Sequence, residues 1–551
     1  MQRFGRSGLF VKFMAVPAVF LGSATAAIAD PLYPSIGETG IEALTLHAEP
    51  YNLLGRKVAI GQVEIGRPGK FGFDKQASWQ PQLNLSQLFF VDSKAIPDEN
   101  VDDHAGMVAG IMVSSDKRQL GIAPEARLFA SAVGSLSDSG QLEECLATQH
   151  VARQNGEDVR AINYSFGESL DRDDRPNPVL DGNALFTQCL DWTARVYDVL
   201  HVVAGNQGSG GIPIPTDQFN GITTAYTTQF KGTDFNKIDF ANLSDLPEGI
   251  GSTLIRAEIN YGDRRAISVA APGSRLELIT TFNRIKQVSG TSFAAPHITG
   301  TVALLQEYGD RQIKNQVANW SLDSRRHEVM KAVLLNSAEK LEDQGDGKLL
   351  GMKRTIFTED NRTWLESEAY TNSEIPLHIQ MGTGQLNARR SHQQFAGGQW
   401  SPTAPVASIG WNYDEISHQN YHDYLIESPL PTGSFVSATA AWDRRVELND
   451  LNDNNLFDQG ETFRDLGLND LNLYLLPAAS NNLKDAICHS NSGVDSVEHI
   501  FCPIPAIAQY KLRVVFPERV NEESQDYGIA WWTAGKNYNQ AVETPNQFPR
   551  Q

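Results

Sequence analysis

The sequence lacks the excess of basic residues that nucleic-acid binding requires. Asp and Glu number 66 against 46 Lys and Arg, so the 551-residue chain has a formal net charge of −20 at pH 7. Proteins bind DNA, RNA and anionic lipid surfaces through clustered Lys and Arg. This balance therefore argues against nucleic acid as a partner and against an anionic membrane surface.

Long hydrophobic runs are also missing after the first thirty residues. Before that point, three basic residues precede an apolar stretch at 13–21, and small residues follow at positions 27 and 29. This order is typical of a secretory signal, whereas the alternative, a membrane anchor, needs about 20 apolar residues. We expect residues 1–29 to be a signal peptide and the mature chain to begin near Asp30. The product would then be exported, to the periplasm or the medium, without a transmembrane anchor.

Cysteine is scarce, with four in the whole chain. An even number in an exported chain favours disulfides, and the spacing lacks the close pairs of a zinc site. Of the three possible pairings we predict Cys145–Cys189 and Cys488–Cys502, because each pair lies within one proposed domain. The alternative is four free buried thiols.

Short apolar or β-branched runs alternate with helical stretches from residue 55 to about 388. Strands separated by helices imply right-handed crossovers and a parallel sheet with helices on both faces, an α/β fold. The strands are predicted at 57–60, 128–133, 159–163, 200–204 and 265–270, and the helices at 140–154 and 183–196.

The pattern changes near residue 398 to short alternating strands separated by turn residues. This pattern indicates an all-β sandwich. Its strands are predicted at 434–442, 472–476, 510–516 and 527–532, without a helix of convincing length between them; the one candidate segment is 481–487. We therefore divide the mature chain into an N-terminal extension (30–54), an α/β domain (55–397), a β-sandwich domain (398–538) and a disordered tail (539–551).

Three motifs in the α/β part carry chemistry together. Residues 289–300 read SGTSFAAPHITG, residues 103–110 read DHAGMVAG, and residues 203–208 read VAGNQG. Each has an ordinary structural explanation alone, such as a helix cap or a turn. In this order and spacing they resemble the nucleophile, histidine and oxyanion motifs of the subtilisin-like serine protease family.

The resemblance covers about 55–388 and implies a serine endopeptidase that acts on proteins or peptides. It assigns Ser292 as the nucleophile and His104 as the general base and acid. The Asn206 side chain and the Ser292 N–H would form the oxyanion hole. The predicted substrate-binding residues are Ser165, Phe166, Gly167, Ala204 and Gly205. Pro296 is expected in the first turn of the nucleophile helix, where its missing N–H costs nothing.

The acid position departs from the family, which has an Asp at the end of the first strand. Here that strand ends in Glu64, the positional match. A carboxylate is needed to hold the imidazole in one tautomer and to stabilise its cation, and Glu can supply it. Asp92, Asp102 and Asp103 are the other candidates.

The departure at Glu64 leaves two other functions open. One is a catalytically impaired subtilisin-like binding or surface protein, and the other is a different acyl-transfer hydrolase on the same scaffold. The segment 30–57 is too short to fold as an independent inhibitory prodomain. The β-sandwich is a candidate for binding substrate, a partner or the cell envelope.

A calcium loop is predicted in the β-sandwich domain. Residues 450–461 read DLNDNNLFDQGE and match an EF-hand loop, except that Asn455 stands where the loop has Gly. Acids and amides on alternate residues let their oxygens converge on one hard cation. The predicted ligands of this structural Ca²⁺ are Asp450, Asn452, Asn454, Asp458 and Glu461. The alternative is an acidic turn without metal, and the peptidase chemistry itself would need no cofactor.

Overall fold

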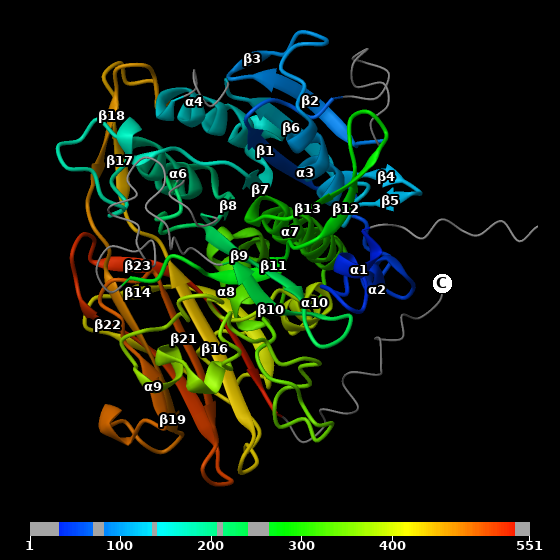
Figure 1. Cartoon of the computed structure of the whole chain (residues 1–551). Coiled ribbons are helices and arrows are strands. Elements are labelled where there is room, and N and C mark those ends of the chain that lie inside the picture. The colour runs from blue at the N-terminus through cyan, green and yellow to red at the C-terminus, as the bar shows by residue number, and fades with distance from the viewer. Residues whose placement is uncertain (1–31, 70–81, 135–139, 207–212, 241–263, 535–551) are drawn as a thin grey trace, which may run out of the picture.

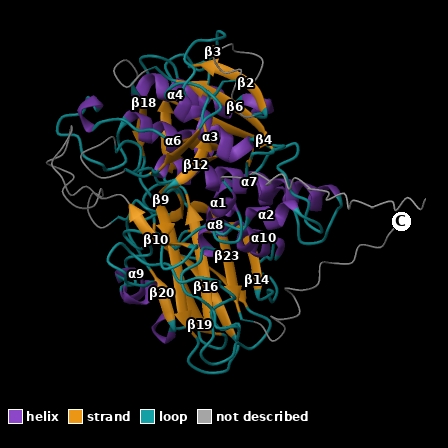
Figure 2. Ribbon diagram, turned by 45° about the vertical axis from the view of Figure 1, so that its right-hand side comes forward, coloured by secondary structure: helices purple, strands orange, loops and turns teal. Residues whose placement is uncertain are grey.

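The computed structural model describes residues 32–69, 82–134, 140–206, 213–240 and 264–534. The predicted signal peptide (1–29) and disordered tail (539–551) lie outside the described residues. None of the helices within those ranges combines the length and the apolar character that a membrane crossing would need. In Figures 1 and 2, a sheet with flanking helices forms the upper half, and most of the C-terminal strands form the lower half; the hairpin of β17 (Val446–Asn449) and β18 (Thr462–Asp465) reaches up beside α4 (Gln141–Ala152) and α6 (Leu185–Tyr197).

A mostly parallel sheet forms the centre of the upper half. Its strands are β1 (Ala59–Glu64), β2 (Leu85–Phe90), β3 (Ser93–Lys94), β6 (Arg127–Ala132), β7 (Val159–Tyr164), β8 (Leu200–Ala204), β9 (Ile222–Gln229), β10 (Phe235–Phe240) and β11 (Val269–Pro272). In the described part of the chain their order is β10-β9-β8-β7-β1-β6-β2-β3, with β11 also paired to β9. Only the pairings of β10 and β3 are antiparallel. The predicted α/β fold is confirmed.

Helices cover both faces of this sheet. The larger ones are α3 (Asp103–Val113), α4 (Gln141–Ala152), α6 (Leu185–Tyr197), α7 (Thr291–Lys314), α8 (His327–Asn336) and α10 (Ala388–Ala396). Side chains alternate along a strand: in β1, Ile60 packs in the core with α3 and α7, whereas Val63 packs with α4 and α6. Gln62 and Glu64 share the face of Ile60, and Gln62 Nε2 donates to Ala105 O of α3 at 3.1 Å. The pleat of β1 thus directs Glu64 toward α3.

The predicted helices at 140–154 and 183–196 are confirmed as α4 and α6. The strand predicted at 265–270 begins only at Val269, because its first residues are held by the β-sandwich: Arg265 N donates to Asp495 Oδ1 at 3.4 Å. The remaining elements that precede the sandwich strands in the sequence are α1 (Tyr33–Ile36), α2 (Ala43–His47), α5 (Gln154–Glu157), α9 (Glu368–Thr371), three 3₁₀ turns (Leu170–Arg172, Leu322–Arg325, Trp364–Glu366) and the strands β4 (Ser115–Asp116), β5 (Gln119–Leu120), β12 (Leu276–Ile279) and β13 (Ile285–Val288).

The N-terminal extension is built into the core of the α/β half. Leu32, Ile36 and Leu46 of the extension are fully buried in the same cluster as the apolar side chains of α7. Where the extension ends, the backbone N–H groups of Leu54 and Gly55 both donate to Glu307 Oε2 of α7 at 2.7 Å. The extension therefore covers α7 as a structural part of the fold.

Two four-stranded antiparallel sheets form the lower half. They have the orders β14-β23-β16-β21 and β15-β22-β19-β20. The strands are β14 (Ile409–Ser417), β15 (Tyr421–Leu425), β16 (Phe435–Trp442), β19 (Asp470–Pro477), β20 (Cys488–Ser490), β21 (Val497–Pro503), β22 (Tyr510–Glu518) and β23 (Ser524–Thr533), and β17 (Val446–Asn449) with β18 (Thr462–Asp465) forms a separate hairpin. The predicted sandwich is confirmed, and the candidate segment 481–487 contains a 3₁₀ turn, Leu483–Asp485, in place of a long helix.

The two halves meet in a shared hydrophobic cluster, and the sandwich also has a cluster of its own, formed by strands of both its sheets. Trp411, Ala441 and Ala530 of the sandwich pack in the same cluster as α7 and α8. Helix α8 approaches β23 so closely that a Cβ at Gly528 would lie 2.5 Å from the Glu328 carbonyl carbon. The sandwich is therefore joined to the α/β half through its contacts with α7 and α8.

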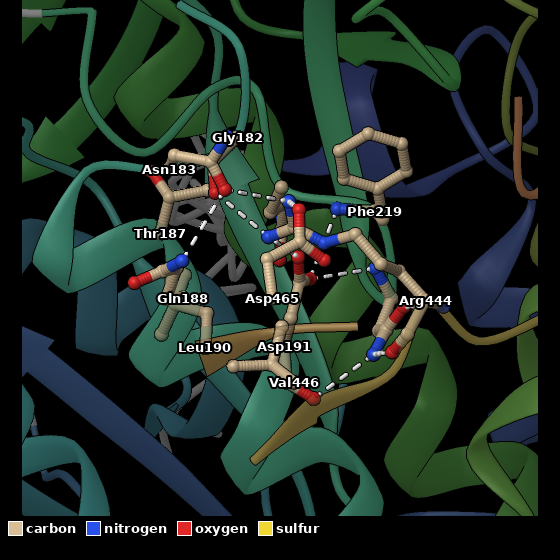
Figure 3. Close-up of polar contacts among 12 residues, drawn as sticks. Gly182, Asn183, Thr187, Gln188, Leu190, Asp191, Phe219, Arg444, Val446 and Asp465 are labelled. Atoms are coloured by element: carbon tan, nitrogen blue, oxygen red, sulfur yellow. Dashed lines mark hydrogen bonds and ion pairs between the residues drawn. The ribbon is translucent and has the colours of Figure 1, made fainter. Parts of the chain in front are cut away.

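A buried ion pair also joins the halves. Arg444, after β16, donates through Nη2 to Asp191 Oδ2 of α6 at 2.6 Å and to Gly182 O at 2.7 Å. Figure 3 shows these residues with Asp465, whose Oδ2 lies 3.4 Å from Arg444 Nη1. Removing one partner of such a pair would leave an uncompensated buried charge.

Both predicted disulfides are present. Cys145–Cys189 joins α4 to α6, and Cys488–Cys502 joins β20 to β21. No free cysteine remains.

Candidate active site

Glu64 and His104 lie side by side. Glu64 is the last residue of β1, and His104 is the second residue of α3. His104 Nδ1 lies 3.4 Å from Glu64 Oε2; the carboxylate side chain is 2% exposed and the imidazole side chain 36%. The structure therefore places the predicted acid beside the nitrogen of His104 that an orienting carboxylate must reach.

This pairing changes the proton affinity of His104. Burial lowers the pKa of the imidazole, but the Glu64 charge and its hydrogen bonding raise it by more. The pKa of His104 therefore lies above its ordinary value of 6.5. A raised pKa is what a general base needs when it must hold a proton during the reaction.

The three other candidate acids are engaged elsewhere. Asp102 is the N-cap of α3, and its Oδ1 accepts a hydrogen bond from Ala105 N at 3.0 Å. Asp103 Oδ1 accepts from Thr281 N at 2.7 Å. Asp92 is exposed, and Ser93 Oγ donates to it at 3.1 Å. Glu64 is the candidate acid in contact with His104 Nδ1.

Ser292 lies in the first turn of α7 and is 8% exposed. Its Oγ donates to Ser165 O at 3.1 Å. The ring of Phe293, the next residue, lies 5.3 Å from that of His104, centroid to centroid. The start of α7 therefore contacts His104 through Phe293, the residue after the predicted nucleophile, and the N-terminal end of a helix favours developing negative charge.

The prediction that Pro296 lies in the first turn of the nucleophile helix is wrong. Helix α7 begins at Thr291, so Pro296 is its sixth residue. At this position the missing N–H leaves the carbonyl four residues earlier, that of Ser292, without its helical donor. Ser165 Oγ donates to Ser292 O at 2.7 Å instead. Asn163 Nδ2 in turn donates to Ser165 Oγ at 2.9 Å. The end of β7 thus supplies the hydrogen bond that the proline removes.

The predicted oxyanion segment lies against the start of α7. Ala204 ends β8, and Gly205 N donates to Thr224 O at 3.0 Å. Thr291 Oγ1 donates to Gly205 O at 2.5 Å, which fixes this backbone to the residue before Ser292. Asn206 follows directly and is 5% exposed.

The predicted substrate edge, Ser165 to Gly167, continues from the end of β7. Phe166 is 6% exposed and stacks on Phe186, with ring centroids 6.0 Å apart. Glu168 N, one residue further, donates to Ile214 O at 2.7 Å. Phe166 therefore anchors this edge in the core, which leaves the backbone rather than the Phe166 side chain for contacts with a ligand.

Two supporting contacts were not predicted from the sequence. Thr281, at the tip of the β12–β13 hairpin, donates to Asp103, next to His104. His297 Nδ1 lies 2.8 Å from Phe293 O, and its Nε2 lies 3.0 Å from Ser35 Oγ of the N-terminal extension. The contacts of Thr281 with Asp103 and of His297 with Ser35 join segments far apart in the sequence, and no local pattern indicates them.

The predicted calcium loop joins β17 to β18 and has EF-hand-like backbone contacts. Asp450 accepts hydrogen bonds from the N–H groups of Asn454 and Asn455, at 3.3 and 2.6 Å. Asn455 has φ 60°, the left-handed conformation that the EF-hand glycine normally supplies. Glu461 Oε1 accepts from Leu451 N at 2.8 Å.

The loop side chains converge only in part. Asp458 Oδ2 accepts hydrogen bonds from the amides of Asn452 and Asn454, at 2.8 and 2.7 Å. The carboxylates of Asp450, Asp458 and Glu461 do not form a close metal-binding group among the described residues. The backbone thus fits a calcium loop, while the side chains bond to one another.

Residues 87–352 match the family model described as the subtilase family. This part of the chain is a subtilase. The matched residues include His104, Asn206 and Ser292, but Glu64 precedes them. The subtilase assignment makes the chain a serine peptidase at the level of its family.

The chain is similar in sequence to bacterial subtilisins. Subtilisin Savinase of Lederbergia lenta is 27% identical over 292 residues, which cover 51% of this chain and 89% of that protein. Subtilisin E of Bacillus subtilis (strain 168) is 25% identical over 280 residues, 49% of this chain and 60% of that protein. A solved structure of a prenylagaramide maturation protease aligns at 19% identity over 61% of this chain and 92% of that one, with a TM-score of 0.38.

Proposed function

We propose that the chain is an exported serine endopeptidase that forms an acyl-enzyme on Ser292. His104 takes the hydroxyl proton and later returns it to the leaving amine, while Glu64 orients His104. The observation that carries this proposal is the 3.4 Å contact between His104 Nδ1 and the buried Glu64 carboxylate. It gives the chain a complete acid–base pair in spite of the departure from the family's Asp.

The resting position of Ser292 is compatible with this chemistry. Its Oγ donates to Ser165 O, and rotation about χ1 between staggered positions redirects it. Catalytic hydrogen bonds are often long or misaligned before substrate binds. In the reaction Ser292 turns to His104 as the substrate carbonyl arrives.

The oxyanion of the tetrahedral intermediate is held by the Asn206 amide and the Ser292 backbone N–H. Two features support this assignment. Asn206 directly follows a backbone segment that Thr291 fixes to the start of α7, and that helix start carries partial positive charge. Fixed donors cost little reorganisation when the charge develops.

An extended polypeptide is the substrate class that the site favours. Ser165 to Gly167 and Ala204 to Gly205 continue from β7 and β8, which are adjacent parallel strands. Backbone N–H and C=O groups at strand ends can pair with an extended chain. The predicted signal peptide and the two disulfides support action outside the cytoplasm.

We also propose that the loop from Asp450 to Glu461 binds a structural Ca²⁺. The left-handed Asn455 and the inward carboxylate of Asp450 support this proposal. Binding requires Asn452 and Asn454 to turn their amide oxygens, in place of their nitrogens, toward the ion. Binding of substrate or a partner by the β-sandwich stays a prediction.

Casein cleavage by the full chain tests the proposed function. Wild type is expected to cleave casein into peptides, and Ser292→Ala is expected to lose this activity by several orders of magnitude. Ser93→Ala, at an exposed serine on β3, is the matched control and should keep the wild-type rate. A well-folded wild type without activity would favour the impaired binding or surface protein.

A further inference from the structure

Outside the candidate active site, one histidine meets three carboxylates where α8 passes between the two halves of the molecule. Asp198 is the C-cap of α6, and His327 and Glu328 are the first two residues of α8. Asp443 follows β16 of the sandwich. The side chains of His327, Glu328 and Asp443 are buried, and that of Asp198 is 31% exposed.

The distances between these groups suit a small metal ion. His327 Nδ1 lies 2.9 Å from Asp198 Oδ1 and 3.3 Å from Glu328 Oε2. One ligand atom from each of the three residues lies within 4.8 Å of the others. A tetrahedral ion with bonds of about 2.0–2.1 Å separates its ligand atoms by about 3.3 Å. The two separations from His327 Nδ1 are therefore close to this value, and the third separation stays within 4.8 Å.

The other nitrogen of His327 has the partner that a metal-binding imidazole requires. Its Nε2 lies 3.0 and 3.1 Å from the two carboxylate oxygens of Asp443. In the neutral tautomer that carries its proton on Nε2, the Nε2–H group donates a hydrogen bond to Asp443. Nδ1 then keeps a lone pair that faces Asp198 and Glu328. A carboxylate behind the histidine is the usual outer partner of a metal ligand.

An independent observation comes from Glu328. Its side chain is 7% exposed, and its Oε2 is buried without a hydrogen bond from any residue in the described part of the chain. A buried carboxylate oxygen without a donor is costly, and Oε2 is the oxygen next to His327 Nδ1. A metal ion at this point would satisfy Glu328 Oε2.

The positive side chains near the cluster do not neutralise all of its carboxylates. Arg326 Nη1 lies 3.6 Å from Asp198 Oδ2. Lys331 Nζ donates to Phe219 O at 2.6 Å and to Ser496 Oγ at 3.3 Å. These two positive groups are fewer than the three carboxylates, so with a neutral imidazole the cluster retains negative charge.

We propose that Asp198, His327 and Glu328 bind a divalent transition-metal ion such as Zn²⁺, with Asp443 holding the imidazole. One nitrogen and two oxygen ligands favour Zn²⁺ or a similar ion over Ca²⁺ and Mg²⁺, which prefer oxygen alone. The ion ties the end of α6 to the start of α8 and, through Asp443, to the sandwich. It contacts no residue of the candidate active site, so its role is structural.

Metal binding to the full chain tests the proposal. The protein is stripped with EDTA, returned to saturating Ca²⁺, and titrated with Zn²⁺. We expect one Zn²⁺ per chain, and with Co²⁺ the intense visible absorption of a tetrahedral nitrogen–oxygen site. Glu328→Gln should weaken Zn²⁺ binding at least about 100-fold, and Asp443→Asn about 10- to 100-fold. Glu342→Gln, at an exposed carboxylate, is the matched control and should change nothing.

Two results would overturn the proposal. One is a folded wild type that binds no Zn²⁺ and gives no tetrahedral Co²⁺ spectrum; His327 would then be an imidazolium held by ion pairs alone. The other is Zn²⁺ binding that neither Glu328→Gln nor Asp198→Asn weakens. The Co²⁺ spectrum of the wild type decides the matter without a variant if Glu328→Gln fails to fold.

Discussion

Ser165 and Ser292 hold each other through two reciprocal hydrogen bonds. Ser165 Oγ donates to Ser292 O at 2.7 Å, and Ser292 Oγ donates to Ser165 O at 3.1 Å. The first bond satisfies the carbonyl that Pro296 leaves without a helical donor. The residue at the end of β7 thus positions the first turn of α7 and the resting hydroxyl of Ser292 at once.

A double-mutant cycle tests this relationship. Ser165→Ala leaves the buried Ser292 carbonyl without a donor and should cost about 1–3 kcal/mol in the free energy of unfolding. Pro296→Ala returns a backbone N–H to position 296, so Ser165→Ala should cost clearly less in that background. Denaturant unfolding in a Ser292→Ala background, which prevents self-cleavage, measures both. Equal costs in the two backgrounds would contradict the compensation.

The pH dependence of kcat/KM tests the contact between Glu64 and His104. Because Glu64 raises the pKa of His104 above 6.5, activity should fall as pH drops through a midpoint above that value. Below the midpoint the imidazole is protonated and cannot accept the Ser292 proton. Glu64→Gln should lower the midpoint and reduce kcat by about 10⁴-fold, because a neutral amide cannot stabilise the imidazolium.

Asp92→Asn is the matched control for the acid assignment and should retain the wild-type profile. A fully active Glu64→Gln together with an inactive Asp92→Asn would make the assignment wrong.

His392 provides a test of stability against pH. Burial lowers the pKa of this histidine to about 4, and its ring packs edge-on against Tyr308 with centroids 4.4 Å apart. The unfolded chain therefore binds a proton here between about pH 6.5 and 4 that the folded chain does not, so stability falls as pH falls through that range. His392→Phe keeps the ring and should flatten this fall by about 1.4 kcal/mol per pH unit. Unfolding at pH 7 and pH 5 measures the slope, and an unchanged slope would refute the prediction.

Calcium should stabilise the full chain through the loop from Asp450 to Glu461. At free Ca²⁺ 100 times Kd, the gain in unfolding free energy is about 2.7 kcal/mol. Glu461→Gln removes charge and an oxygen ligand, so it should reduce the gain, whereas Glu342→Gln should not. Comparing the variants separates this loop from any other calcium site. An equal calcium effect in wild type and Glu461→Gln would show that the loop is an acidic turn that binds no calcium.

The elements that the sequence predicts well are those with strong local patterns. The buried runs of β6, β7 and β8 and the periodicity of α4 and α6 are evident from neighbouring residues alone. Glu64 could be placed because it ends a strand, and strand pleat decides which face it occupies. The disulfide pairing followed from domain membership.

The contacts that the sequence did not predict are those between distant segments. Ser35 supports α7 across more than 250 positions of sequence, and the sandwich completes the core around α8. Neither contact produces a periodic pattern of apolar residues in the sequence. The place of Pro296 in α7 was wrong by one turn because helix ends depend on the tertiary contacts of Thr291 and Ser165 as much as on local sequence.

Covalent labelling with a fluorophosphonate tests the central claim most directly. Such a probe reacts with a serine hydroxyl only when a base and an oxyanion hole activate it. We predict one adduct per chain, mapped to Ser292 by peptide mass spectrometry, with no adduct in Ser292→Ala and slow labelling in Glu64→Gln. Absence of labelling in folded wild type at neutral pH, or an adduct on another serine, would contradict the account.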